Sequence, residues 1–164
     1  MYSLPKRKRN RLQSYDYSEN GAYFVTICTK NKQKLFWNVG AISDRPHGTV
    51  PLSEYGEIVQ QAINEINNFR LEITVVNSVV MPNHVHLLLI FEQWENGRSE
   101  IAPTDLSNVV RFLKSYVTKR IGFSPWQKSF HDHVVRNQAE YNTIWEYIDQ
   151  NPETWETDCF FIDY

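Results

Sequence analysis

The sequence predicts an α+β fold of the ferredoxin-like type, an antiparallel sheet with helices on one face, followed by one further C-terminal helix. This prediction depends on the order of strand-like and amphipathic helical segments, which is β-α-β-β-α-β and then a helix. The chain has 164 residues, of which 41% are hydrophobic and 22% charged, as in an ordinary globular protein. We expect a basic N-terminal arm at residues 1–20 and a single domain at residues 21–164.

The first half of the pattern contains one strand and one helix. Residues 23–29 are rich in β-branched and aromatic side chains and predict the first strand. Residues 30–52 carry glycines and prolines and predict an irregular excursion. From Ser53, a suitable N-cap, to about residue 69, apolar side chains recur at helical spacing.

The middle of the chain predicts two adjacent strands and a second helix. Residues 73–80 and 84–91 are the strands, and a tight connection joins them. A helix follows, capped by Thr104 or Asp105. Its apolar stripe consists of Leu106, Val109, Val110, Leu113 and Val117.

The last strand and helix complete the pattern. A short fourth strand is expected around residues 133–135. The last helix begins at Asn137, and Glu140 stands three residues later as the partner in a capping box. It ends near residue 150 because Pro152 disfavours helical geometry at the residue before it.

Charge is unevenly distributed, although the net charge is only −2. Basic patches of this kind can hold phosphates while the overall charge stays near zero. The alternative is a solubilising arm and a solvated helix face. The candidate phosphate-binding residues are Lys6, Arg7, Lys8, Arg9 and Arg11 at the N-terminus, and Arg111 and Lys114 on the second helix.

The sequence carries no sign of secretion or of a membrane segment. No apolar stretch approaches the roughly 20 residues that a membrane span needs. Cys28 and Cys159 lie far apart without metal-ligand spacing. We therefore expect free thiols in a reducing cytosol.

Two histidines one residue apart, His84 and His86, stand inside the most hydrophobic run of the chain. A β-strand points alternate side chains to opposite faces, so both imidazoles share one face. Such a pair is hard to explain as packing, because each buried ring has nitrogens that need partners. The pair predicts a site for one divalent cation.

The last helix carries a tyrosine that can act beside that cation. Its apolar stripe of Tyr141, Ile144, Trp145 and Ile148 should face the core, and Tyr147 lies outside the stripe. Asn151 is four residues further along and faces the same way as Tyr147 if the final turn persists. We therefore expect Tyr147 as a nucleophile and Asn151 as a third ligand to Mg²⁺ or Mn²⁺.

A bound metal would offset the energetic cost of using a tyrosine as a nucleophile at pH 7. Only about one unperturbed tyrosine in a thousand is a phenolate at pH 7, a deficit of about 4 kcal/mol. A cation that polarises a scissile phosphate can supply several kcal/mol. Attack by the phenolate would leave a phosphotyrosine and a free 3′-hydroxyl.

Two motifs resemble a known family. The run Pro-Asn-His-Val-His at residues 82–86 resembles the His-hydrophobe-His motif of the HUH single-strand endonucleases. The run Tyr-Ile-Asp-Gln-Asn-Pro at residues 147–152, followed by Trp155, is similar to the C-terminal signature of the REP-associated tyrosine transposases, relatives of the single-tyrosine insertion-sequence transposases. The resemblance extends from about residue 8 to residue 158.

This resemblance implies a metal-dependent transposase that cleaves and joins single-stranded DNA through a 5′-phosphotyrosine. Carried over by position, His84 and His86 are the metal histidines, Tyr147 the nucleophile and Asn151 the third ligand. The family's usual DNA is a palindrome folded as a hairpin, so we expect a nucleoid-associated bacterial protein. The sequence leaves open whether Tyr147 acts in its own subunit or completes the site of a partner in a homodimer.

Other interpretations remain open at this stage. A second His-x-His pair, His131 and His133, has an acidic middle residue and is expected to be structural or to face DNA. Tyr141 is the weaker candidate nucleophile because it lies on the packing stripe. Two other classes of function are a catalytically silent nucleic-acid-binding module and a zinc hydrolase that uses the four histidines and a water.

Overall fold

The computed structural model describes residues 21–38, 52–69, 72–92 and 105–161. The elements follow the predicted order β-α-β-β-α-β-α, with a 3₁₀ turn after the first strand and another near the end. They are β1 (Gly21–Cys28), η1 (Lys30–Lys32), α1 (Glu54–Phe69), β2 (Ile73–Val80), β3 (His84–Phe91), α2 (Leu106–Ile121), β4 (His131–Val135), α3 (Gln138–Gln150) and η2 (Trp155–Thr157).

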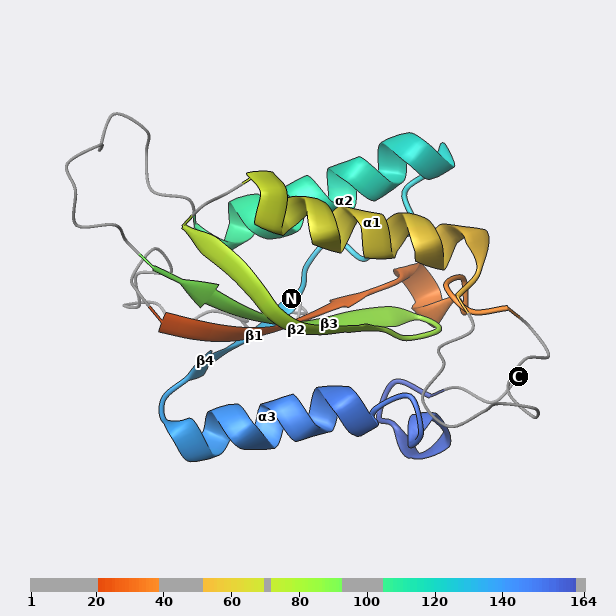
Figure 1. Ribbon diagram of the computed structural model, residues 1–164. Coiled ribbons are helices and arrows are strands. Elements are labelled where there is room, and N and C mark those ends of the chain that lie inside the picture. The colour runs from red at the N-terminus through yellow and green to blue at the C-terminus, as the bar shows by residue number, and fades with distance from the viewer. Residues whose placement is uncertain (1–20, 39–51, 70–71, 93–104, 162–164) are drawn as a thin grey trace, which may run out of the picture.

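The four strands form one antiparallel sheet in the order β2-β3-β1-β4. Helices α1 and α2 cover one face of this sheet, and α3 packs on the opposite face against β2 and β3 (Figure 1). The predicted α+β class is confirmed, with a four-stranded antiparallel sheet and three α-helices in the described part of the chain. The sheet therefore has two helices on one face and a single helix on the other.

Side-chain caps start the helices where the sequence predicts them. The amide of Gly56 donates to Ser53 Oγ at 3.1 Å, and Asp105 Oδ1 accepts from the Asn108 amide at 2.8 Å. Asn137 Oδ1 accepts from the Glu140 amide at 2.9 Å. These bonds satisfy helix amides that have no partner within the helix. Asp105, rather than Thr104, is therefore the cap of α2.

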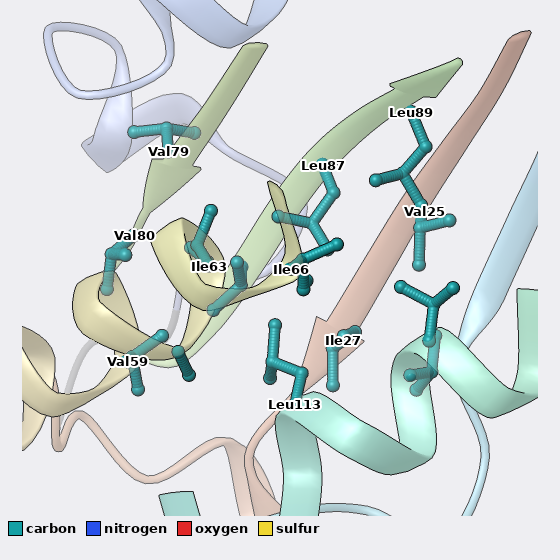
Figure 2. Close-up of a cluster of buried hydrophobic side chains, with 14 of the residues drawn as sticks. Val25, Ile27, Val59, Ile63, Ile66, Val79, Val80, Leu87, Leu89 and Leu113 are labelled. Atoms are coloured by element: carbon teal, nitrogen blue, oxygen red, sulfur yellow. The ribbon is translucent and has the colours of Figure 1, made fainter. Parts of the chain in front are cut away.

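The main core lies between the sheet and the α1–α2 layer. Its side chains project from both helices and from the facing side of the strands, as Figure 2 shows for Val59, Ile63 and Ile66 of α1, Leu113 of α2, and Val25, Ile27, Leu87 and Leu89 of the sheet. Phe36 and Trp37 are also buried. None of the described helices is long and apolar enough to cross a membrane.

Strand β3 is buried on both faces, and this positions the candidate site. Leu87 and Leu89 point towards α1 and α2, so the alternating residues His84 and His86 point to the α3 face. Thr26 of β1 stands directly opposite His86 in the ladder and shares that face. The sheet register therefore directs both imidazoles towards the C-terminal helix.

Gly56 provides a test of the packing at the start of α1. A Cβ atom at this position would overlap the backbone carbonyl oxygen of Phe36, which also accepts a hydrogen bond from the Ser53 amide. We expect Gly56→Ala to lower the free energy of unfolding by about 1–3 kcal/mol, measured by urea denaturation. Gln61→Ala, at an exposed position of the same helix, is the control. Equal stability of both variants would contradict this packing.

Candidate metal centre and tyrosine

The two histidines of β3 face each other on the α3 side of the sheet. Their Nε2 atoms lie 3.0 Å apart, and both side chains are buried. Phe160 packs against the ring of His84, with centroids 4.6 Å apart, and Phe24 stacks on His86 at 5.1 Å. The rings are therefore held by aromatic neighbours, with their Nε2 atoms next to each other.

Asn83 determines which nitrogen of His84 carries the proton. Its Nδ2 donates to two backbone carbonyls, those of Lys32 at 3.3 Å and Phe160 at 2.9 Å. This orients Asn83 Oδ1 towards His84 Nδ1, at 2.8 Å. A carbonyl oxygen can only accept, so Nδ1 of His84 carries the hydrogen and Nε2 keeps its lone pair.

His86 has an equivalent partner on the neighbouring strand. Thr26 Oγ1 lies 2.8 Å from His86 Nδ1, and both side chains are buried. A hydroxyl can accept a hydrogen bond from Nδ1–H, and in that tautomer Nε2 of His86 is available as a ligand. Each imidazole is thus oriented by an outer partner, an arrangement found at metal-binding histidines.

Burial keeps both imidazoles neutral at physiological pH. Desolvation, together with the charge of Lys32, lowers the pKa of His84 to about 3. Desolvation and the neighbouring His84 lower the pKa of His86 well below its usual value. Neutral imidazole is the form that binds a metal, so the site does not have to lose protons before binding at pH 7.

Tyr147 projects from α3 to the histidine pair. Its hydroxyl lies 3.3 Å from His86 Nε2, and its ring packs edge-on against Phe24 and His86. The side chain remains 38% exposed, whereas Ile148 beside it is buried in the core. The phenol is therefore close to the candidate ligand atoms and also accessible from outside.

A carboxylate from the C-terminal segment completes the cluster. Asp158 Oδ2 accepts hydrogen bonds from the Tyr147 hydroxyl at 3.2 Å and from Asn151 Nδ2 at 3.0 Å, while its Oδ1 accepts from the Phe160 amide at 2.6 Å. Ligand atoms of His84, His86 and Asp158 lie within 4.8 Å of one another. Two imidazoles and one carboxylate form a suitable donor set for a divalent cation.

Asn151 lies beside this cluster, as the predicted helical spacing requires. It keeps helical backbone angles at the end of α3, with φ −55° and ψ −41°. Its Oδ1 atom is buried without a hydrogen-bond partner. A buried amide oxygen without a partner is costly, and it is available as a further oxygen ligand.

The environment keeps the Tyr147 phenol protonated. Desolvation, the charge of Asp158 and the hydrogen bond to Asp158 raise the pKa of Tyr147 to about 12. A phenolate at this position therefore needs a positive charge nearby.

The other predicted site residues lie elsewhere. Arg111 and Lys114 are on α2, across the sheet from Tyr147 (Figure 1). The Lys114 ammonium donates to the backbone carbonyls of Gln127 at 2.7 Å and Ser129 at 3.1 Å, so it is directed towards the protein's own backbone. The basic residues Lys6, Arg7, Lys8, Arg9 and Arg11 lie outside the described residues.

The second histidine pair is separate from this cluster. His131 and His133 are on β4, and His133 Nε2 lies 2.6 Å from Glu140 Oε1. Neither belongs to the group of convergent ligand atoms found among the described residues. In this structure His133 instead links β4 to the start of α3.

Sequence reasoning missed Asp158 and the partner role of Asn83. Asp158 follows the proline that ends the last helix, and no periodic pattern connects it to β3. Asn83 stands next to His84 in the motif, but its function depends on carbonyls of Lys32 and Phe160, which are distant in sequence. Only the fold brings these groups together.

Comparison with known proteins extends these observations. No family model matches the chain. An uncharacterized protein of Haemophilus influenzae is 32% identical over 175 residues, which cover 96% of this chain and 94% of that protein. A solved structure, a REP-associated tyrosine transposase bound to a REP hairpin, superposes with a TM-score of 0.64 at 21% identity, covering 88% of this chain and 74% of that one. The chain therefore belongs to the same family as the Haemophilus influenzae protein, and it has the fold of the REP-associated tyrosine transposase.

Proposed function

We propose that this protein is a metal-dependent single-stranded DNA endonuclease and strand transferase, a transposase that forms a 5′-phosphotyrosine intermediate. The observation that carries the proposal is that Tyr147, a partly exposed residue, has its hydroxyl 3.3 Å from Nε2 of His86, one of two facing imidazoles. A tyrosine on the last helix of a ferredoxin-like βαββαβ domain would then act as the nucleophile.

The donor set fits a divalent metal, Mg²⁺ or Mn²⁺. His84 and His86 offer Nε2 atoms while Asn83 and Thr26 occupy their Nδ1 atoms, and Asp158 offers a carboxylate oxygen. Asn151 Oδ1 is buried without a partner and is a further candidate. When bound, the ion supplies charge that polarises the scissile phosphate and offsets the negative charge that develops there.

The residues of the chain support an in-line transfer of the phosphoryl group. Tyr147 Oη attacks the phosphorus, an O–P bond forms to the phenol oxygen, and the bond from phosphorus to the 3′-oxygen breaks. Asp158 Oδ2, which already accepts the phenol's hydrogen bond, is placed to take the proton. The departing 3′-oxygen keeps the bonding electron pair and takes up a proton as a 3′-hydroxyl. Attack by another 3′-hydroxyl on the phosphotyrosine reverses these changes and joins strands.

Hairpin DNA is the proposed substrate. A protein with this fold has been solved with a REP hairpin, and the basic residues of the N-terminal arm, together with Arg111 of α2, offer charges for phosphate contact. The 3.3 Å approach of Tyr147 to His86 occurs within one chain, which favours an active site that does not need a second subunit.

Metal binding can be measured directly. We expect Mn²⁺ to bind the wild-type protein at neutral pH, as measured by isothermal titration calorimetry. His84→Ala should abolish this binding because it removes one of two facing imidazoles. Asn83→Ala should weaken it by roughly 10- to 100-fold because His84 then loses the partner that sets its tautomer.

The third ligand can be assigned by the same titration. Asp158→Asn keeps the size of the side chain but removes its charge, and we expect a loss of Mn²⁺ affinity of at least about tenfold. His131→Ala is the control and should bind like the wild type. Undiminished affinity in Asp158→Asn together with a loss in Asn151→Ala would instead assign the oxygen ligand to Asn151.

The covalent intermediate can be detected on a gel. Wild-type protein incubated with Mn²⁺ and end-labelled hairpin DNA, taken from palindromes that flank its own gene, should give a labelled adduct on a denaturing gel. Tyr147→Phe should lose this adduct because the ring packing remains and only the nucleophilic oxygen is removed. Tyr141→Phe, on the same helix, should keep it.

Two results would contradict the proposal. DNA binding without any adduct under varied metals would indicate a catalytically silent binding module. Cleavage that survives Tyr147→Phe would indicate hydrolysis by a metal-activated water.

A further inference from the structure

A basic turn lies directly beside the metal centre. It comprises residues 30–34, Lys-Asn-Lys-Gln-Lys, and follows β1. The amide of Thr29 donates to the Asn83 carbonyl at 2.8 Å, and Asn83 Nδ2 donates to the Lys32 carbonyl. The turn is therefore attached to the residue that immediately precedes His84.

The backbone of this turn is held in a sparsely populated conformation. Asn31 and Lys32 both have positive φ angles, 57° and 53°, and they are the non-glycine residues with positive φ among the described part of the chain. Asparagine tolerates this region, but lysine rarely adopts it. Strained residues of this kind persist where surrounding contacts enforce them, and they gather at functional sites.

Hydrogen bonds on both sides of Lys32 enforce this conformation. Thr29 Oγ1 lies 2.9 Å from the Gln33 carbonyl oxygen and 3.0 Å from the Asn83 carbonyl oxygen, so these two acceptors share its one hydrogen, and the Gln33 amide donates to the Lys30 carbonyl at 3.4 Å. Thr29 is itself fully buried. The direction of the Lys32 side chain is thus coupled to the position of the metal-site strand.

The Lys32 ammonium lies over an aromatic neighbour of the metal centre. Its Nζ is 5.9 Å from the centroid of the Phe160 ring, and that ring also contacts the rings of His84 at 4.6 Å and His86 at 6.2 Å. No carboxylate among the described residues forms an ion pair with Lys32. Lys32 is a partly buried lysine without an anionic partner among the described residues, next to a centre that would bind a phosphodiester, so its ammonium is available for a phosphate.

We infer that Lys32 binds a phosphate of the cleaved DNA strand, next to the phosphate that Tyr147 attacks. The strained turn would position Lys32 for this contact. This role of Lys32 rests on the proposed function, which identifies single-stranded DNA as the molecule that is cleaved. Lys32 would be a positioning residue: it fixes the strand across the metal centre and takes no part in bond breaking.

The test measures binding without cleavage. Tyr147→Phe protein with Mn²⁺ is titrated into a fluorescein-labelled thymidine 12-mer, and anisotropy is recorded from about 50 to about 200 mM salt. In this Tyr147→Phe background, the further substitution Lys32→Gln should lower the affinity for the 12-mer by roughly five- to tenfold. It should also reduce the slope of log affinity against log salt by about 0.7. Lys32→Arg should restore both values, because it keeps the charge.

Lys30→Gln is the matched control, since it removes the same charge from an exposed position on the same turn. Equal losses in Lys30→Gln and Lys32→Gln would overturn the inference, as would a Lys32→Arg variant that restores neither value. A fall in Mn²⁺ affinity alongside DNA affinity in Lys32→Gln would show a structural role and would also overturn it. An absent adduct in the wild type counts against the proposed function alone, because this titration needs no cleavage.

Discussion

The burial of β3 on both faces is the constraint on which the site depends. One face supplies Leu87 and Leu89 to the core under α1 and α2, so the alternating positions must also be enclosed when α3 packs on the other side. An imidazole enclosed in this way is stable only if its nitrogens have partners. Asn83 and Thr26 provide a partner for Nδ1 of each ring, and the two Nε2 atoms are left facing each other.

The same enclosure accounts for the electrostatics of the centre. Desolvation keeps both histidines neutral and the Tyr147 phenol protonated, while Asp158 adds a negative charge beside them. A site with neutral imidazoles, one carboxylate and a protonated phenol is arranged to receive positive charge. The cluster draws on β1, β3, α3 and the segment after η2, so its geometry depends on the whole sheet and on the C-terminal residues.

Much of the fold follows from local sequence rules. The β-branched, aromatic and apolar runs of the strands and the apolar stripes of the helices predicted every described strand and α-helix to within a few residues. Ser53, Asp105 and Asn137 were predictable as caps, because their side chains bond amides only three residues away. The helical spacing of Tyr147 and Asn151 likewise predicted that both side chains face the same way.

The sequence by itself determined the local features, which depend on residues within one helical turn or one strand repeat of each other. These are the helices and strands, the helix caps, and the shared face of His84 and His86. The tertiary structure alone decided the contacts between distant segments. Asp158 reaches Tyr147 and Lys32 approaches Phe160 because the C-terminal segment folds back over β3. The backbone conformation of Lys32 depends on the side chain of Asn83, 51 positions away. Such contacts follow from sheet order and packing, which no local periodicity encodes.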